Sequence, residues 1–300
     1  NMPSLLFHRG TRWQGAVRGS TNILASFFLR AGCPVTWLTR PIHAGHVLLR
    51  GNKLNGLPKL MSSAERHSDG AFEVTPFTLL PIIKSKFLGK HFWAVSAQLG
   101  YRTIYPPLSR ILKSAKQPLP DLIWTTGGDG GALRSAFPHA RQIVQCVDIY
   151  EAYAGPAQNR LEDEDYRHAD AIVAIGYALA NYLIHERGVS EEKVTVIGQG
   201  ADLELFGINH SEPDDLANVP HPRLIWVGVL DKADPDLMAA ALAALPLGVG
   251  SLVLIGPEAV WARNLAQRDP RVFVLGPRSA NEVAAYLQHC DVGLMLYDQN

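Results

Sequence analysis

From Asp121 onward the chain alternates short β-branched runs with helical stretches, and this alternation limits its fold more than any other feature. Strands that alternate with helices form a parallel sheet covered by helices on both faces, so the sequence predicts an α/β fold. At the amino end, a helix over Thr21–Ala31 between strands Leu5–Phe7 and Val35–Thr39 predicts one more unit of this kind. Eight further strands are predicted at Asp121–Thr125, Gln142–Val147, Ala171–Ile175, Lys193–Ile197, Arg223–Val227, Ser251–Ile255, Arg271–Leu275 and Val292–Tyr297.

A polar segment at 208–222 divides the predicted strands into two series. It is rich in Asn, His, Ser, Pro and Asp and has no hydrophobic period, as is typical of a linker. We therefore expect an amino-terminal domain over 1–207, a linker over 208–222 and a carboxyl-terminal domain over 223–300. The second domain has only four predicted strands, and since a doubly wound domain normally has more, we expect it to be incomplete at its carboxyl end.

The net charge of zero is a cancellation between two oppositely charged parts. Residues 1–118 hold 16 Lys and Arg against 3 Asp and Glu, whereas residues 119–300 hold 12 against 25. A basic region of this size predicts an anionic partner, namely lipid headgroups, a lipid-linked phosphate or nucleic acid. Its densest part, 78–116, interleaves basic with apolar and aromatic residues. That pattern fits either a peripheral membrane surface or an ordinary packed helix pair with a solvated lysine face.

Several kinds of site and location are excluded by the sequence. Cys33, Cys146 and Cys290 are far apart, so neither a disulfide framework nor a cysteine zinc site is expected. No apolar run is long enough to span a bilayer, and we expect no signal peptide and a cytoplasmic, reducing location. The DxD patterns at 163–165 and 234–236 are interpreted as solvated faces or helix caps, and the HxxH at 43–46 as chance. We therefore expect no metal and no cofactor.

One carboxylate stands at the position where open α/β sheets bind ligands. Asp148 directly follows the predicted strand Gln142–Val147, at the carboxyl end of the sheet. Glu151 lies three residues further on, so the pair also fits a helix capping box. A cap introduces a sustained helix, however, and Gly155-Pro156 interrupts this one within two turns. An ionised Asp148 in a cleft is suited to act as a general base toward a hydroxyl nucleophile.

Glycines follow several predicted strands, where they permit close approach of a ligand to the backbone. In the second domain, Gly228, Gly256 and Gly276 predict a nucleotide pocket in which Arg278 pairs with a phosphate. In the first domain, the run 125–131 matches neither a dinucleotide fingerprint nor a Walker motif, and a tight strand-to-helix turn is the better interpretation. Asp202 is interpreted as a helix N-cap that also faces the cleft between the domains.

Taken in order, 142–155, 194–206 and 275–297 resemble the GT-B glycosyltransferases, in particular bacterial polysaccharide enzymes such as the xanthan glucuronosyltransferase and the teichuronic-acid transferases. The most specific piece is Gly200–Phe206, a Gly-x-Asp-x-x-x-Phe segment. The resemblance implies two Rossmann-like domains and a nucleotide-sugar donor, expected to be a UDP-sugar. It also implies a lipid-linked or polysaccharide acceptor at the inner face of the cytoplasmic membrane, and it gives nucleic acid no role.

The resemblance further implies roles for single residues. Asp148 matches the catalytic base of an inverting transfer. The donor is expected at Asp202, Gly228, Leu230, Gly256, Gly276, Arg278 and Tyr297, and the acceptor at Arg9, Arg12, Trp13, Arg18, Tyr150 and Glu151. Two alternatives stay open. One is a retaining transferase of the same fold, in which Asp148 is only a cap, and the other is a non-catalytic module that binds a glycolipid or a partner enzyme.

Overall fold

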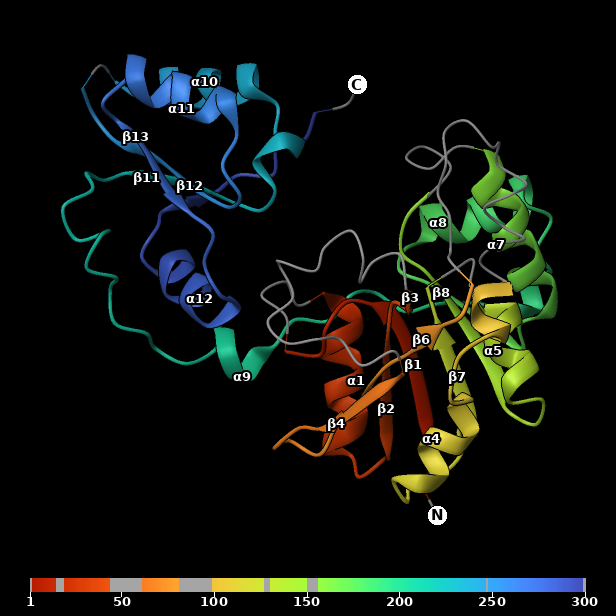
Figure 1. Ribbon diagram of the computed structural model, residues 1–300. Coiled ribbons are helices and arrows are strands. Elements are labelled where there is room, and N and C mark those ends of the chain that lie inside the picture. Colours follow the sequence, from red (N-terminus) through yellow and green to blue (C-terminus); the bar gives the residue numbers. More distant parts are fainter. Residues whose placement is uncertain are drawn as a thin grey trace. The chain divides into compact units, whose positions relative to one another are not determined.

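The computed structural model describes residues 2–14, 19–43, 61–80, 99–126, 130–149, 156–246 and 248–298. These residues form two compact units, the first reaching to Gly200 and the second running from Ala201 (Figure 1). Each unit contains a mainly parallel sheet with helices packed on both faces. The predicted α/β fold with two Rossmann-like domains is therefore confirmed.

The first unit is built around an eight-stranded sheet. Its strands lie in the order β10-β9-β8-β7-β1-β2-β5-β4, and every neighbouring pair is parallel except β4 with β5. A separate parallel pair is formed by β3 and β6. The elements are β1 (Leu5–Gly10), α1 (Ser20–Arg30), β2 (Val35–Thr39), β3 (Ile42–His43), β4 (Ser63–Arg66), β5 (Phe72–Thr75), β6 (Phe77–Thr78), α4 (Leu108–Ser114), β7 (Leu122–Thr125), α5 (Gly130–Ala136), β8 (Arg141–Cys146), α7 (Pro156–His168), β9 (Ala171–Ala174), α8 (Tyr177–Asn181) and β10 (Val194–Val196).

The two faces of this sheet have separate cores because side chains alternate along each strand. On β1, Leu5 and Phe7 pack with α1 and with the indoles of Trp37 and Trp124. Leu6, between them, packs on the other face against α4 and α5. A third cluster joins β8 and β9 to α7 and α8. This layering brings the carboxyl ends of the parallel strands to one edge, where the connecting loops emerge.

Within the basic stretch 78–116, residues 81–98 lie outside the described residues. In its described part, α4 buries Leu108, Ile111 and Leu112 in the core and exposes Arg110 and Lys113. The helix α4 thus has the packed arrangement with a solvated basic face, whereas Leu79, Leu80 and Leu99 of the same stretch are exposed. Among the residues that the structure describes, no helix has the length and apolar character to cross a membrane.

The second unit contains a four-stranded parallel sheet in the order β13-β12-β11-β14. Helices α10 and α11 pack on one face, and α12 packs on the other (Figure 1). Its elements are α9 (Leu203–Phe206), β11 (Arg223–Val227), α10 (Pro235–Ala243), β12 (Ser251–Ile255), α11 (Val260–Arg268), β13 (Val272–Gly276), α12 (Ala280–Gln288) and β14 (Val292–Gly293).

The polar segment 208–222 is a folded part of the second unit. Leu216 and Val219 are buried in the core formed with β11 and α12. The Arg223 guanidinium donates hydrogen bonds to the backbone oxygens of Leu216 and Val219, both at 2.8 Å, and of His289 at 2.9 Å. A buried arginine therefore fastens this segment, which is typical of a structured connection rather than of a free linker.

The last predicted strand, Val292–Tyr297, is shorter in the structure. Only Val292 and Gly293 pair with β11, and the next residue, Leu294, donates its backbone N–H to Ile225 at 2.8 Å. Tyr297 then forms an isolated antiparallel bridge with Ala233. The chain thus leaves the sheet direction after Leu294, because its next partner lies in the turn before α10.

Candidate functional site

Asp148 lies at the carboxyl edge of the first sheet, two residues beyond the end of β8. The side chain is half-buried, and its Oδ1 accepts a hydrogen bond from the backbone N–H of Ile149 at 2.9 Å. Oδ2 has no hydrogen-bond partner among the described residues. The Cys146 thiol donates to the backbone oxygen of Asp148 at 3.7 Å, and burial raises the pKa of that thiol, which keeps it protonated. Among the described residues, one carboxylate oxygen of Asp148 is therefore bonded and the other has no partner.

A buried ionic cluster supports β8 and β9 from behind. Arg187 follows α8, and its side chain is 8% exposed. It donates to Asp163 at 2.9 Å, to Glu162 at 3.2 Å and to the Tyr182 hydroxyl at 3.0 Å. Burial alone would lower the pKa of Arg187, but the bonds to Tyr182 and Asp163 outweigh it and raise the pKa. This cluster joins α7 to the turn after α8.

The amino end of α5 binds a carboxylate of the chain itself. Asp165 in α7, 2% exposed, accepts hydrogen bonds from the backbone N–H groups of Gly130 at 3.0 Å and Gly131 at 2.9 Å. A Cβ on Gly130 would lie 1.8 Å from Nε2 of Gln142, so a larger residue there would force the buried Gln142 side chain to move. Asp165 is thus a buried cap for a neighbouring helix, not a solvated face. Residues 127–129 of the glycine-rich run lie outside the described residues.

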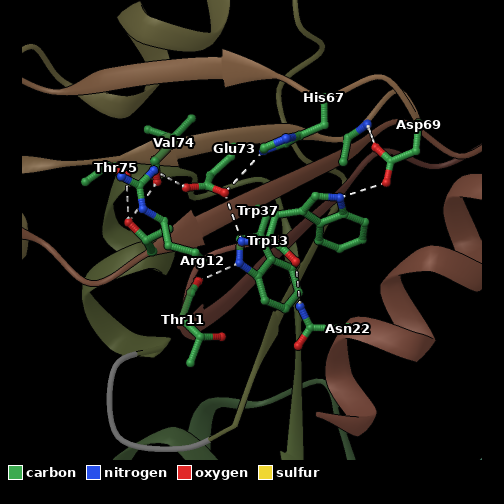
Figure 2. A network of polar contacts seen from close by, with 12 residues as sticks. Thr11, Arg12, Trp13, Asn22, Trp37, His67, Asp69, Glu73, Val74 and Thr75 are labelled. Atoms are coloured by element: carbon green, nitrogen blue, oxygen red, sulfur yellow. Dashed lines mark hydrogen bonds and ion pairs between the residues drawn. The ribbon is translucent and has the colours of Figure 1, made fainter. Parts of the chain in front are cut away.

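The basic loop after β1 is anchored by a buried carboxylate, Glu73 of β5 (Figure 2). This side chain is 2% exposed and accepts hydrogen bonds from Nη1 of Arg12 at 2.8 Å and from the backbone N–H of Trp13 at 2.9 Å. Its second oxygen also lies 3.2 Å from Nε2 of His67. The Arg12 side chain remains 65% exposed, so the loop exposes a cation whose position is fixed by the buried Glu73.

Trp13 was predicted to contact an acceptor, but the structure places its indole in the core. The residue is 1% exposed, its Nε1 donates to Asp69 at 2.8 Å, and its ring meets Trp37 edge-on with centroids 5.2 Å apart. An acceptor cannot reach an indole held in this way, so Trp13 supports the loop from inside. Of the other predicted acceptor residues, Arg9 lies in β1 but its side chain is not described, while Arg18, Tyr150 and Glu151 lie outside the described residues.

A neutral histidine lies beneath the same edge. His8 of β1 is buried, and its Nε2 lies 2.7 Å from the hydroxyl of Tyr101, whose ring meets the imidazole edge-on. Burial, assisted by the positive charge of Arg40, lowers the pKa of His8 to about 4. The imidazole is therefore uncharged at neutral pH and acts as a buried hydrogen-bonding group.

In the second unit, two of the predicted glycines allow neighbouring loops to touch. A Cβ on Gly256 would lie 1.7 Å from the backbone oxygen of Gly228, so the loops after β11 and β12 pack backbone against backbone. The N–H groups of these two glycines donate to Ile255 and Gly276, at 2.9 and 3.1 Å. They are thus engaged within the sheet, and the glycines provide close packing rather than free amides.

The other residues predicted to bind the sugar donor differ in their exposure to solvent. Leu230 is fully buried beneath the β11 loop and supports it. Tyr297 is 50% exposed and rests edge-on against Trp226 at 4.9 Å. Gly276 has a φ of +75°, in the left-handed region that favours glycine. Asp202 caps α9 by accepting a hydrogen bond from the backbone N–H of Leu205 at 3.2 Å, which confirms the predicted cap.

Arg278, predicted to bind a phosphate, is held by partners within the second unit. Its Nη2 donates to Asp215 at 2.8 Å and its Nε to the Tyr286 hydroxyl at 3.0 Å. Tyr286 in turn donates to Asp215 at 2.6 Å. The bonds to Tyr286 and Asp215 raise the pKa of Arg278. Arg278 therefore fastens the segment before β11 to α12, and a phosphate must compete with a carboxylate for it.

No cluster of three or more His, Cys, Asp or Glu side chains suited to hold a metal ion occurs in the part of the chain that the structure describes.

Comparison with known proteins identifies the architecture. No protein-family model matches the chain. It is 24% identical over 194 residues to TuaH of Bacillus subtilis, which is named as a teichuronic acid biosynthesis glycosyltransferase. That match covers 59% of this chain and 49% of TuaH, so it spans about half the length of this relative.

Many solved structures match the chain, among them two that cover almost all of it. HepE from Anabaena, in complex with UDP and glucose, has a TM-score of 0.60 at 16% identity, covering 97% of this chain and 73% of HepE. Sucrose-phosphate synthase from Thermosynechococcus elongatus has a TM-score of 0.66 at 18% identity, covering 98% of this chain and 75% of that protein. The chain has the GT-B fold. The resemblance read from the sequence is thereby confirmed at the level of the fold.

Within this GT-B fold, the first unit brings Asp148 and Arg12 to one sheet edge, since both follow parallel strands. Sequence reasoning found both of them, but it missed the carboxylates that organise the loops, namely Glu73, Asp165 and Asp215. Each of these has at least one partner 34 or more positions away, which a local motif does not mark. A buried Glu between two apolar strand residues, as in Phe72–Val74, is the one signal that was available.

Proposed function

We propose that the chain is a glycosyltransferase that moves a sugar from a UDP-sugar to a hydroxyl group of a lipid-linked or polysaccharide acceptor, with inversion at the anomeric carbon. The observation that carries this proposal is the placement of Asp148 in a GT-B fold. Its carboxylate lies at the ligand-binding edge of the first unit, with one oxygen fixed by a backbone amide and the other open. The similarity to TuaH and to the UDP complex of HepE supports the donor class.

In this mechanism Asp148 acts as the general base. The open carboxylate oxygen accepts the proton of the acceptor hydroxyl as that oxygen attacks the anomeric carbon of the donor. The bond between the anomeric carbon and the diphosphate oxygen breaks at the same time, and UDP leaves with the bonding electrons. Attack from the face opposite the leaving group inverts the configuration. The backbone amide of Ile149 keeps the carboxylate oriented during the transfer.

The donor is proposed to bind at the carboxyl edge of the second sheet. Gly228 and Gly256 hold the loops after β11 and β12 together there, and Tyr297 adds an exposed aromatic surface. Gly276 permits the turn that carries Arg278, and Asp202 fixes the start of α9. Arg278 contributes a phosphate contact to the extent that the diphosphate displaces Asp215.

The test combines a substitution with the stereochemistry of the product. Asp148→Asn keeps the size of the side chain but removes the base, so we expect the transfer rate to fall by at least 100-fold, in the range that general-base catalysis supplies. Glu65→Gln, an exposed carboxylate on β4, is the matched control and should keep full activity. The configuration at the anomeric carbon is read by NMR of the product.

Three outcomes would overturn parts of the proposal. Retention of configuration would assign a retaining transferase. Full activity of Asp148→Asn would remove Asp148 as the base. Binding of UDP-sugar and acceptor without turnover would assign a non-catalytic binding module.

A further inference from the structure

Three neighbouring strands of the first unit each end in a loop that exposes one large apolar side chain. Ile149 follows β8, Tyr177 follows β9 and Ile197 follows β10, and they are 37%, 78% and 50% exposed. Large apolar side chains grouped at a ligand-binding edge mark an interaction site more often than isolated ones do. Tyr177 is the most exposed of the three and the only aromatic ring among them.

Strand register places Tyr177 beside Asp148. Cys146, the last residue of β8, pairs with Ala174, the last residue of β9, and Ile175 donates its backbone N–H to Cys146 at 3.2 Å. Neighbouring strands are about 4.8 Å apart, so the two loops leave the sheet side by side. Asp148 and Tyr177 thus follow paired strand ends, two residues after Cys146 and three after Ala174.

The backbone of Tyr177 is fixed although its ring is free. Gly176 precedes it in an extended conformation and accepts the N–H of Ala180 at 3.1 Å, which starts α8. Ala180 and Leu183 are buried in the cluster formed with β8 and β9. Directly after α8 the chain forms a π-helical turn, Tyr182–Glu186, a local irregularity that occurs frequently at functional sites. The aromatic surface is thus presented on a rigid support.

The charges at this edge decide which ligand fits. The described loop residues directly after β8, β9 and β10, at 147–149, 175–176 and 197–200, contain one carboxylate, Asp148, and no Lys or Arg. A phosphate would be repelled here, and a bare hydrocarbon would leave the carboxylate without a hydrogen-bond donor. A sugar ring satisfies both groups, because its C–H face is apolar and its hydroxyl groups donate to carboxylates. The cations of this edge, Arg12 and Arg40, follow β1 and β2 instead.

We infer that Tyr177 is the stacking surface for the sugar ring of the acceptor, and that the reacting hydroxyl belongs to a pyranose held between Tyr177 and Asp148. This rests on the proposed function for the role of Asp148. It adds the chemical class of the group that occupies this edge and a residue that determines specificity for it.

The test uses binding of small pyranosides, which does not depend on turnover. Methyl glycosides of common hexoses are titrated into the chain, and saturation-transfer NMR reports which protons touch the protein. We expect Tyr177→Ala to weaken binding about tenfold, and Tyr177→Phe to retain it because the ring is kept. Phe27→Ala, which removes a 58% exposed ring on α1, is the matched control and should bind as the wild type does.

The outcomes separate this inference from the proposed function. Equal pyranoside binding by the wild type and Tyr177→Ala, or no pyranoside binding by the wild type, would overturn the stacking role. Either result would leave UDP binding and the effect of Asp148→Asn on transfer intact. Loss of UDP binding by Tyr177→Ala would also overturn the inference, since it would assign Tyr177 to the donor. Ring-dependent binding together with full transfer by Asp148→Asn would support the stacking role and refute the proposed base.

Discussion

The buried histidine of β1 makes the stability of the first unit depend on pH. His8 has a pKa of about 4 in the folded chain against an ordinary value of 6.5, because burial and the charge of Arg40 disfavour the imidazolium. The unfolded chain therefore takes up a proton on His8 at a higher pH than the folded chain does. This contribution to stability is fully present above about pH 6.5 and is lost as the pH falls toward 4.

The size of the effect follows from the two pKa values. The gap between 6.5 and about 4 corresponds to about 3 kcal/mol in full, and about 2 kcal/mol of this is lost between pH 7 and pH 5. We expect His8→Gln to remove that loss, because glutamine can still bond to the Tyr101 hydroxyl but does not titrate. The substitution is expected to change how steeply the free energy of unfolding falls with pH, independently of its effect on that free energy at pH 7.

The assay is urea unfolding at pH 7 and pH 5, followed by hydrogen exchange in peptides that cover β1 and β2, so that the first unit is observed alone. The free energy of unfolding should fall by about 2 kcal/mol more in the wild type than in His8→Gln over this range. His139→Gln, an exposed histidine of the same unit, is the control and should behave as the wild type does. Equal losses in the wild type and His8→Gln would refute the reasoning.

Three further predictions concern stability. Asp165→Ala should lower the free energy of unfolding of the first unit by about 3 kcal/mol in urea, because two buried amides lose a charged acceptor; a loss below about 1 kcal/mol would contradict this. Gly256→Ala should lower the free energy of unfolding of the second unit by more than about 3 kcal/mol, since its Cβ would overlap the Gly228 oxygen. A thermal melt like that of the wild type would exclude the close packing. Asp215→Asn should lower the free energy of unfolding of the second unit by about 1 kcal/mol after solvent screening. Because Arg278 is then held less firmly, amide exchange at the start of α12 should become faster. Unchanged exchange would show that the contact contributes nothing.

The strands that carry the α/β fold could be predicted because their signal is local. From Asp121 onward, the predicted strands before Val292 lie within one residue of the observed bounds at each end. β11 and β12 match in full. The start of α12 has an equally local signal, since Ser279 and Glu282, three positions apart, form a capping box. Likewise, Asp234 caps α10 as expected.

The elements that escaped prediction depend on distant partners. The hairpin of β4 and β5 was missed because Ser63–Arg66 is entirely exposed and has no apolar period. β5 places Glu73 in the core, which is stable only because Arg12 and the loop after β1 neutralise it. Trp13 looked like a surface residue among arginines and glycines, and only its bond to Asp69 reveals why it is buried. Such pairings depend on the tertiary fold and leave no local pattern in the sequence.

Asp165 determines whether the amino end of α5 can bind an anion from solution. A helix that follows a glycine-rich turn attracts anions, and a tethered carboxylate already occupies that position in the first unit. Because it is part of the chain, it competes with any free diphosphate at an effective concentration on the order of millimolar or above. The amides of Gly130 and Gly131 are thereby occupied by a carboxylate of the chain itself. A single substitution at Asp165 is also the shortest route by which such a chain could acquire a second anion site.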